Sequence, residues 1–72
     1  MFGIFKKTLY IRDKFWEYPQ LSQVKEAIAE YCADAGWSYE FVSDTEVIIN
    51  GEKYEFRREL LRGVYDIRLT KI

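Results

Sequence analysis

The chain has 72 residues, enough for one small domain, and its 11 Lys and Arg against 12 Asp and Glu give a formal net charge of −1. With one Cys and no His, its own residues cannot form a disulfide framework or a structural zinc site. No run approaches the ~18 apolar residues of a membrane-spanning helix. The basic pair Lys6-Lys7 follows the first apolar residues instead of preceding them, unlike the charge order of a signal peptide. We therefore expect a cytoplasmic protein with no membrane partner.

The first half of the chain predicts one strand and one helix. Apolar and polar residues alternate over residues 4–12, which is typical of a strand, and residues 13–18 are predicted to form a loop. A helix is predicted over residues 20–35, with Pro19 at its first turn and Gly36 at the position of a left-handed cap. Its apolar face consists of Leu21, Val24, Ala27, Ile28, Tyr31 and Ala35.

After the helix the period changes to two, and three turns divide the rest into strands. The turns are predicted at residues 43–45, at Asn50-Gly51 and near Arg62-Gly63; Asn-Gly is a strong hairpin signal because both positions tolerate positive φ. The order β-α-β-β-β-β indicates a single α+β domain over residues 1–72, with the helix on one face of a mostly antiparallel sheet of four or five strands. The first strand could lie beside the second or the fifth. We prefer the fifth, which gives the spatial order 2-3-4-5-1.

Charge is segregated along the chain although its sum is near zero. Residues 1–12 carry three basic residues and no acid, residues 13–52 carry nine acids against two bases, and residues 53–72 carry six bases against three acids. The helix carries an acidic stripe in which like charges repel at a spacing of four residues: Glu26, Glu30 and Asp34. The stripe is either a surface for a basic partner or an ordinary solvated helix face.

One helix covers one face of such a sheet, so the other face is open to water or to a partner. Basic and aromatic candidates on this open face are Tyr10, Arg12, Arg57 and Arg68, with Asp66 among the acids. Opposite charges such as Glu55 and Arg68 can pair across strands. The face is therefore either a ladder of ion pairs or a platform for single-stranded nucleic acid, although nearly matched charges make the nucleic-acid pattern weak.

The aromatic residues, two Trp, six Tyr and five Phe, divide into a core set and a remainder. The predicted core set is Phe5, Tyr31, Trp37, Tyr39, Phe41, Tyr54, Phe56 and Tyr65. The remainder is Phe2, Tyr10, Phe15, Trp16 and Tyr18, all within the first 18 residues. The segment from Phe15 to Tyr18 is either a lid on the core or an exposed patch of interface anchors. Because Phe15 and Trp16 are adjacent, they should point different ways, and we expect Trp16 or Tyr18 to be partly exposed.

The residue types for catalysis are largely missing. Without His, no usual base activates a Ser, Thr or Cys nucleophile, and Cys32 is best interpreted as a small apolar residue on the helix flank. Glu26 and Glu30 form the one clear carboxylate pair, which is not specific for a metal ion. The four Gly residues fit turns and caps and form no phosphate-binding loop. We therefore predict no catalytic, cofactor-binding or metal-binding residue.

Short segments along the chain carry a further signal: Lys6-Lys7-Thr8-Leu9-Tyr10-Ile11, Tyr18-Pro19, Ala27-Ile28-Ala29-Glu30-Tyr31-Cys32, Tyr39-Glu40-Phe41, Asn50-Gly51-Glu52-Lys53-Tyr54-Glu55, Arg62-Gly63 and Tyr65-Asp66-Ile67. With these segments, nearly the whole chain resembles a family of small domains of unknown function found in clostridial Firmicutes. The resemblance implies a bacterial or phage-borne cytoplasmic protein, and it brings no activity, cofactor or catalytic residue.

These observations predict a non-catalytic protein-interaction module of the regulator or inhibitor type. The alternative is a binder of single-stranded nucleic acid or of a nucleotide on the open sheet face. The candidate interaction residues are Tyr10, Arg12, Phe15, Trp16, Tyr18, Glu26, Glu30, Asp34, Arg57 and Arg68. The partner is an unknown protein or a second copy paired through a sheet edge.

Overall fold

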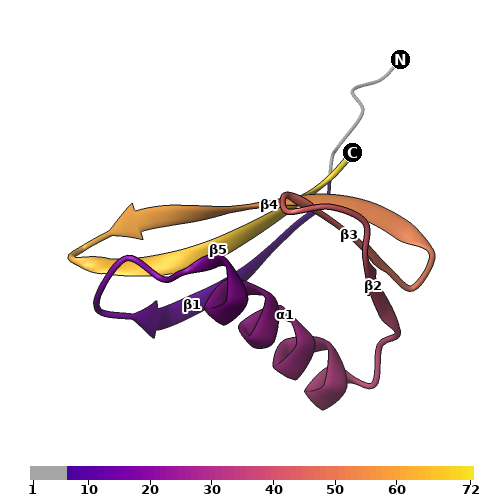
Figure 1. Cartoon of the computed structure of the whole chain (residues 1–72), viewed down its shortest axis with the longest axis horizontal. Coiled ribbons are helices and arrows are strands. Elements are labelled where there is room, and N and C mark those ends of the chain that lie inside the picture. Colours follow the sequence, from indigo (N-terminus) through magenta and orange to yellow (C-terminus); the bar gives the residue numbers. More distant parts are fainter. Residues whose placement is uncertain (1–6) are drawn as a thin grey trace.

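The computed structural model describes residues 7–72, apart from the side chains of Asp13 and Lys14. Its elements are β1 (Thr8–Phe15), α1 (Leu21–Ala35), β2 (Tyr39–Phe41), β3 (Glu46–Ile49), β4 (Glu52–Leu61) and β5 (Val64–Lys71). The five strands form one antiparallel sheet in the order β1-β5-β4-β3-β2, and α1 lies against one face of it (Figure 1). The predicted α+β class, the element order and the place of the first strand beside the fifth are confirmed.

Strand β1 extends further than the alternation predicts. Residues 4–6 of the predicted strand lie outside the described residues, and the strand continues to Phe15, through part of the predicted loop. Ile11 pairs with Ile67 and Phe15 with Tyr65, so β1 advances four residues while β5 advances two. This bulge bends the strand and interrupts its alternation, which is why the period-two pattern stops at residue 12. Beyond the bulge, Phe15 packs against the core.

The helix ends are set by hydrogen bonds of their own backbone. Gln20 is the N-cap, and its N–H donates to the Gln23 side chain at 2.8 Å, so Pro19 precedes the helix instead of standing in its first turn. At the other end Gly36 adopts the predicted left-handed conformation, with φ 78°. The N–H of Trp37 then donates to the carbonyl of Cys32 at 2.8 Å, as in a Schellman motif.

The core lies between α1 and the helix-facing side of the sheet. The helix contributes Val24, Ala27, Ile28 and Cys32, and the strands contribute Ile11, Val47, Ile49, Tyr54, Phe56, Ile67 and Leu69. Burying a large aliphatic or aromatic side chain stabilises the fold by about 1.5–3 kcal/mol. Cys32 is a core residue, as predicted, and burial raises the pKa of its thiol, which keeps it protonated and unreactive.

Two predicted core positions differ from the structure. Tyr39 is exposed because β2 is a three-residue edge strand, and its ring packs only edge-on against Phe41 at 5.8 Å. Ala35 is exposed at the end of the helix, where the sheet no longer faces it. Phe2 and Phe5 lie outside the described residues.

Both predicted hairpins form. Asn50 and Gly51 have φ of 51° and 81°, and Arg62 and Gly63 have φ of 54° and 83°; two consecutive positive values are the signature of a type I′ turn. The second turn closes the hairpin of β4 and β5, whose end reaches past α1 on the side where the loop after β1 also lies (Figure 1).

An ion cluster joins the start of β4 to the end of β5. Lys71 Nζ donates to Glu52 at 2.9 Å, Lys7 Nζ lies 4.0 Å from the same carboxylate, and the Tyr54 hydroxyl donates to it at 3.3 Å. The hydrogen bond from Lys71, followed by its charge, lowers the pKa of Glu52. The same hydrogen bond, in which Glu52 accepts, raises the pKa of Lys71.

The lowered pKa of Glu52 makes stability depend on pH. In the unfolded chain a Glu has a pKa of about 4.3, so the stabilisation by Glu52 is fully present above that value and is lost as the pH falls through the lower folded pKa. We expect Glu52→Gln to lower the melting temperature at pH 7 and to have almost no effect at about pH 2. Thermal denaturation across this range measures the difference, with Glu40→Gln on the edge strand β2 as control. An equal difference between wild type and Glu52→Gln at every pH would contradict the assignment.

Candidate functional site

Four large apolar side chains are exposed at one end of the molecule, and we call them the end patch. Trp16 is 84% exposed, Tyr18 62%, Leu60 57% and Leu61 40%. Trp16 and Tyr18 belong to the loop between β1 and α1, and Leu60 and Leu61 are the last two residues of β4. Leu60 and Leu61 point to opposite faces of the sheet and line different hollows, so the end patch wraps around the end of the hairpin. Large exposed apolar side chains gathered at one end are typical of a surface that contacts another molecule.

The register of three strands brings the two halves of the end patch together. Phe15 of β1 pairs with Tyr65 of β5, and Tyr65 pairs with Leu60 of β4. The Tyr18 ring then packs edge-on against Tyr65, with ring centroids 5.5 Å apart. The loop after β1 therefore lies against the end of the β4–β5 hairpin.

Arg58 fixes the loop in this position. Its Nε donates to the backbone carbonyl of the buried Pro19 at 2.7 Å, and its guanidinium carbon lies 4.5 Å from the centroid of the Tyr18 ring. A cation over an exposed aromatic ring contributes about 0.5–1 kcal/mol. The hydrogen bond and the ring contact together hold Tyr18 in place.

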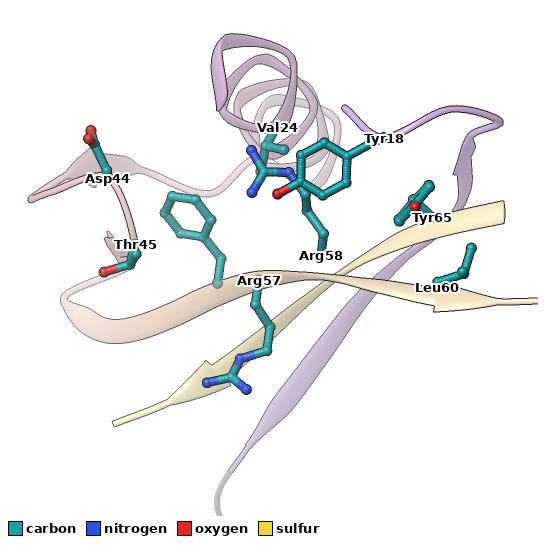
Figure 2. Close-up of a pocket in the computed structure, with 9 residues that line it drawn as sticks. Tyr18, Val24, Asp44, Thr45, Arg57, Arg58, Leu60 and Tyr65 are labelled. Carbon is teal, nitrogen blue, oxygen red and sulfur yellow. The ribbon is translucent and has the colours of Figure 1, made fainter. Parts of the chain in front are cut away.

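A hollow of about 430 Å³ opens beside the end patch on the helix side of the sheet. Tyr18, Leu60 and Tyr65 line one side of it, and Asp44 and Thr45 lie across from them (Figure 2). The Arg57 side chain points away from it, below the sheet (Figure 2). The hollow is within the size range of sites that take a large side chain or a small ligand.

The structure separates the two interpretations of the segment from Phe15 to Tyr18. Phe15 is half-buried and packs against the core, so it belongs to the lid, and its predicted role as an interaction residue stays a prediction. The predicted exposure of Trp16 or Tyr18 is confirmed for both. The segment therefore does both: Phe15 covers the core, and Trp16 and Tyr18 are exposed in the end patch.

The open sheet face brings together the four residues predicted there. Tyr10 pairs with Arg68 and Arg68 with Arg57, which places an aromatic and two basic residues in one row across three strands. The Arg12 guanidinium carbon lies 4.6 Å from the centroid of the Tyr10 ring. Tyr10 and Arg68 are half-buried, whereas Arg12 and Arg57 are exposed.

Carboxylates neutralise much of this row. Arg57 pairs with Glu55 at 3.3 Å and Arg68 with Glu59 at 3.3 Å. The predicted pairing of Glu55 with Arg68 is therefore wrong, because the register sets Arg68 opposite Arg57. Asp66 lies on this face as predicted but is only 3% exposed, so it is not part of a solvent-facing ladder.

The acidic stripe of the helix is separate from both surfaces. Glu26, Glu30 and Asp34 are exposed along α1, and the last turn of the helix carries no basic residue. Lys25 forms an ion pair with Asp44 at 3.4 Å, which joins the helix to the turn before β3. The structure does not bring the stripe together with the end patch or with the open-face row.

Sequence reasoning missed Leu60, Leu61 and Arg58. The available signal was the Leu-Leu pair at the end of an alternating strand, since two consecutive apolar residues point to opposite faces of a sheet. Arg58 gave no local signal, because its contact with Pro19 joins residues 39 positions apart.

Among the described residues, no group of three or more His, Cys, Asp or Glu is placed to hold a metal ion. Residues 7–72 contain no helix that combines the length and apolar character needed to cross a membrane.

Comparisons with protein-family models, curated proteins and solved structures find no match to this chain. The resemblance to the clostridial family stays a prediction.

Substitutions at the adjacent residues Phe15 and Trp16 distinguish a side chain that stabilises the core from one in the end patch. Phe15→Ala removes a side chain packed on the core, so we expect it to lower the free energy of unfolding by roughly 2–3 kcal/mol. Trp16→Ala removes an exposed side chain and should change that free energy by less than about 0.5 kcal/mol. Urea denaturation measures both. A large loss for Trp16→Ala would contradict the placement of Trp16 in the end patch.

Proposed function

We propose that this chain is a non-catalytic protein-binding module of the regulator or inhibitor type, and that the end patch is its contact surface. The observation that carries the proposal is the cluster of four large exposed apolar side chains at one end of the molecule. Trp and Tyr are enriched among the residues that dominate binding energy in protein interfaces. We also propose the cytoplasmic location and bacterial or phage origin expected from the sequence.

Two features of the structure support this surface. The contacts of Tyr18 with Tyr65 and Arg58 hold part of the end patch in place, and a pre-organised surface loses less conformational entropy on binding. The sheet edges are less suitable for adding a partner strand, because β2 has three residues and β1 carries a bulge. Short and bulged edges are common protections against strand pairing.

Capture of partners tests the proposal. Tagged wild type, Trp16→Ala and Val42→Ala are compared as baits in native lysate of cells that express the chain. Val42 is 48% exposed in the segment after β2, which makes it a matched control at another place on the surface. We expect wild type and Val42→Ala to recover the same proteins and Trp16→Ala to lose them.

Thermal denaturation of the three baits must show that all are folded before captures are compared. If folded Trp16→Ala recovers the same partners as wild type, the end patch is not the contact surface and the proposal fails.

A second candidate is binding of single-stranded nucleic acid or a nucleotide on the open sheet face. The row of Tyr10, Arg68 and Arg57, with Arg12 stacked on Tyr10, favours it, since aromatic and basic residues in a row can stack bases and contact phosphates. Pairing of Arg57 and Arg68 with carboxylates makes this candidate weaker, because an ion pair must be broken for each phosphate contact.

Fluorescence anisotropy with a labelled oligothymidine tests the second candidate. We expect no saturable binding at about 0.15 M salt, and none that Arg57→Gln or Arg68→Gln alters. Saturable binding that weakens steeply with salt and is lost in both variants would favour the nucleic-acid function over protein binding.

A further inference from the structure

We infer that a second copy of this chain is the molecule that covers the end patch, in a two-fold dimer that sets the loop after β1 of one copy against the β4–β5 hairpin end of the other. The inference rests on the proposed function, because it names the partner of the same surface. It is carried by the charges beside the patch and by the hollow next to it.

Two charged residues of opposite sign flank the end patch. Glu17 stands between Trp16 and Tyr18 in the loop, and Arg62 follows Leu61 at the hairpin turn. Both are exposed. Within the described part of the chain neither forms an ion pair or a side-chain hydrogen bond. The loop half of the end patch therefore offers the acid Glu17 and the hairpin half offers the base Arg62, beside charges that already have contacts, such as Arg58 over the Tyr18 ring.

This arrangement is complementary to itself under a two-fold rotation. In a two-fold dimer, a residue that contacts a second residue across the interface is matched by the reverse contact. If the loop of one copy faces the hairpin end of the other, each Glu17 faces an Arg62, and two complementary pairs form. A protein of unrelated sequence would have to supply both charges separately, whereas a second copy supplies them by symmetry.

Shape and net charge fit the same occupant. The hollow of about 430 Å³ beside Tyr18 and Leu60 is placed to receive the Trp16 side chain of the other copy, which is 84% exposed in the single chain. A formal net charge of −1 gives little repulsion between copies, and proteins near zero net charge associate readily. The dimer would cover the end patch on each copy, which holds four of the seven large apolar side chains that are exposed among the described residues.

Sedimentation velocity on the full chain, from about 10 µM to about 1 mM, tests the dimer, since small interfaces bind weakly. We expect the mass to rise with concentration from 8.7 kDa toward twice that value. Trp16→Ala should stay at the monomer mass. Glu17→Arg and Arg62→Glu should each weaken association at least about tenfold, because each places like charges together at two symmetric positions.

Mixing the two charge variants is the decisive measurement. A dimer of one Glu17→Arg copy and one Arg62→Glu copy restores opposite charges at both positions, so the mixture should associate about as strongly as wild type, although neither variant does so alone. Glu40→Arg, on the exposed edge strand β2, is the control and should leave association unchanged. Thermal denaturation confirms that every variant is folded.

Two results would overturn the dimer: a monomer mass at every concentration, or association that neither Trp16→Ala nor the charge reversals weaken. The proposed function fails separately. If the chain is monomeric but capture from lysate still depends on Trp16, another protein covers the end patch and the protein-binding function stands. If the chain is monomeric and capture is also independent of Trp16, both proposals fall.

Discussion

A single helix of 15 residues covers the sheet, and at 1.5 Å per residue it is about 22 Å long. Strand β4 has ten residues, which at about 3.3 Å per residue extend to about 33 Å. The helix therefore cannot cover the whole of the β4–β5 hairpin, and the hairpin end projects beyond it (Figure 1). The residues of that end, and of the loop beside it, therefore determine which side chains are exposed there.

The loop after β1 covers this overhang only in part. Tyr18 packs against Tyr65 and is held by Arg58, while the next residue, Pro19, is buried. These contacts close one side of the core but leave Tyr18 itself exposed, along with Leu60 on the helix side of the sheet. A domain of this size has only a few kcal/mol of net stability, so large apolar side chains left in water at one end favour a role at an interface over a role in the fold.

The local parts of this structure follow from the sequence, and the parts that build the site do not. The helix, the Gly36 cap and both type I′ turns depend on residues that are close together in the sequence. Periodicity and turn-forming residues therefore predict them. The bulge that carries β1 to Phe15 depends on its register with β5. The contact between Arg58 and Pro19 joins distant segments. Exposure of Trp16 could be inferred from its adjacency to Phe15, but its neighbours could not.

The charge blocks can likewise be seen in the sequence, but the ion pairs cannot, because they depend on how the strands pair. The sequence separates acids and bases into blocks, yet antiparallel pairing interleaves them, so that Glu46 pairs with Lys53 and Glu59 with Arg68. The net field of the open face is thereby reduced, which leaves little long-range attraction for a polyanion. Within the described residues, Glu17 and Arg62 take no part in this pairing, because they lie in a loop and at a turn. Charges at the rim of an apolar contact contribute more to orientation and partner choice than to affinity. In the proposed dimer the end patch therefore supplies the binding energy, and Glu17 and Arg62 determine the orientation of the two copies.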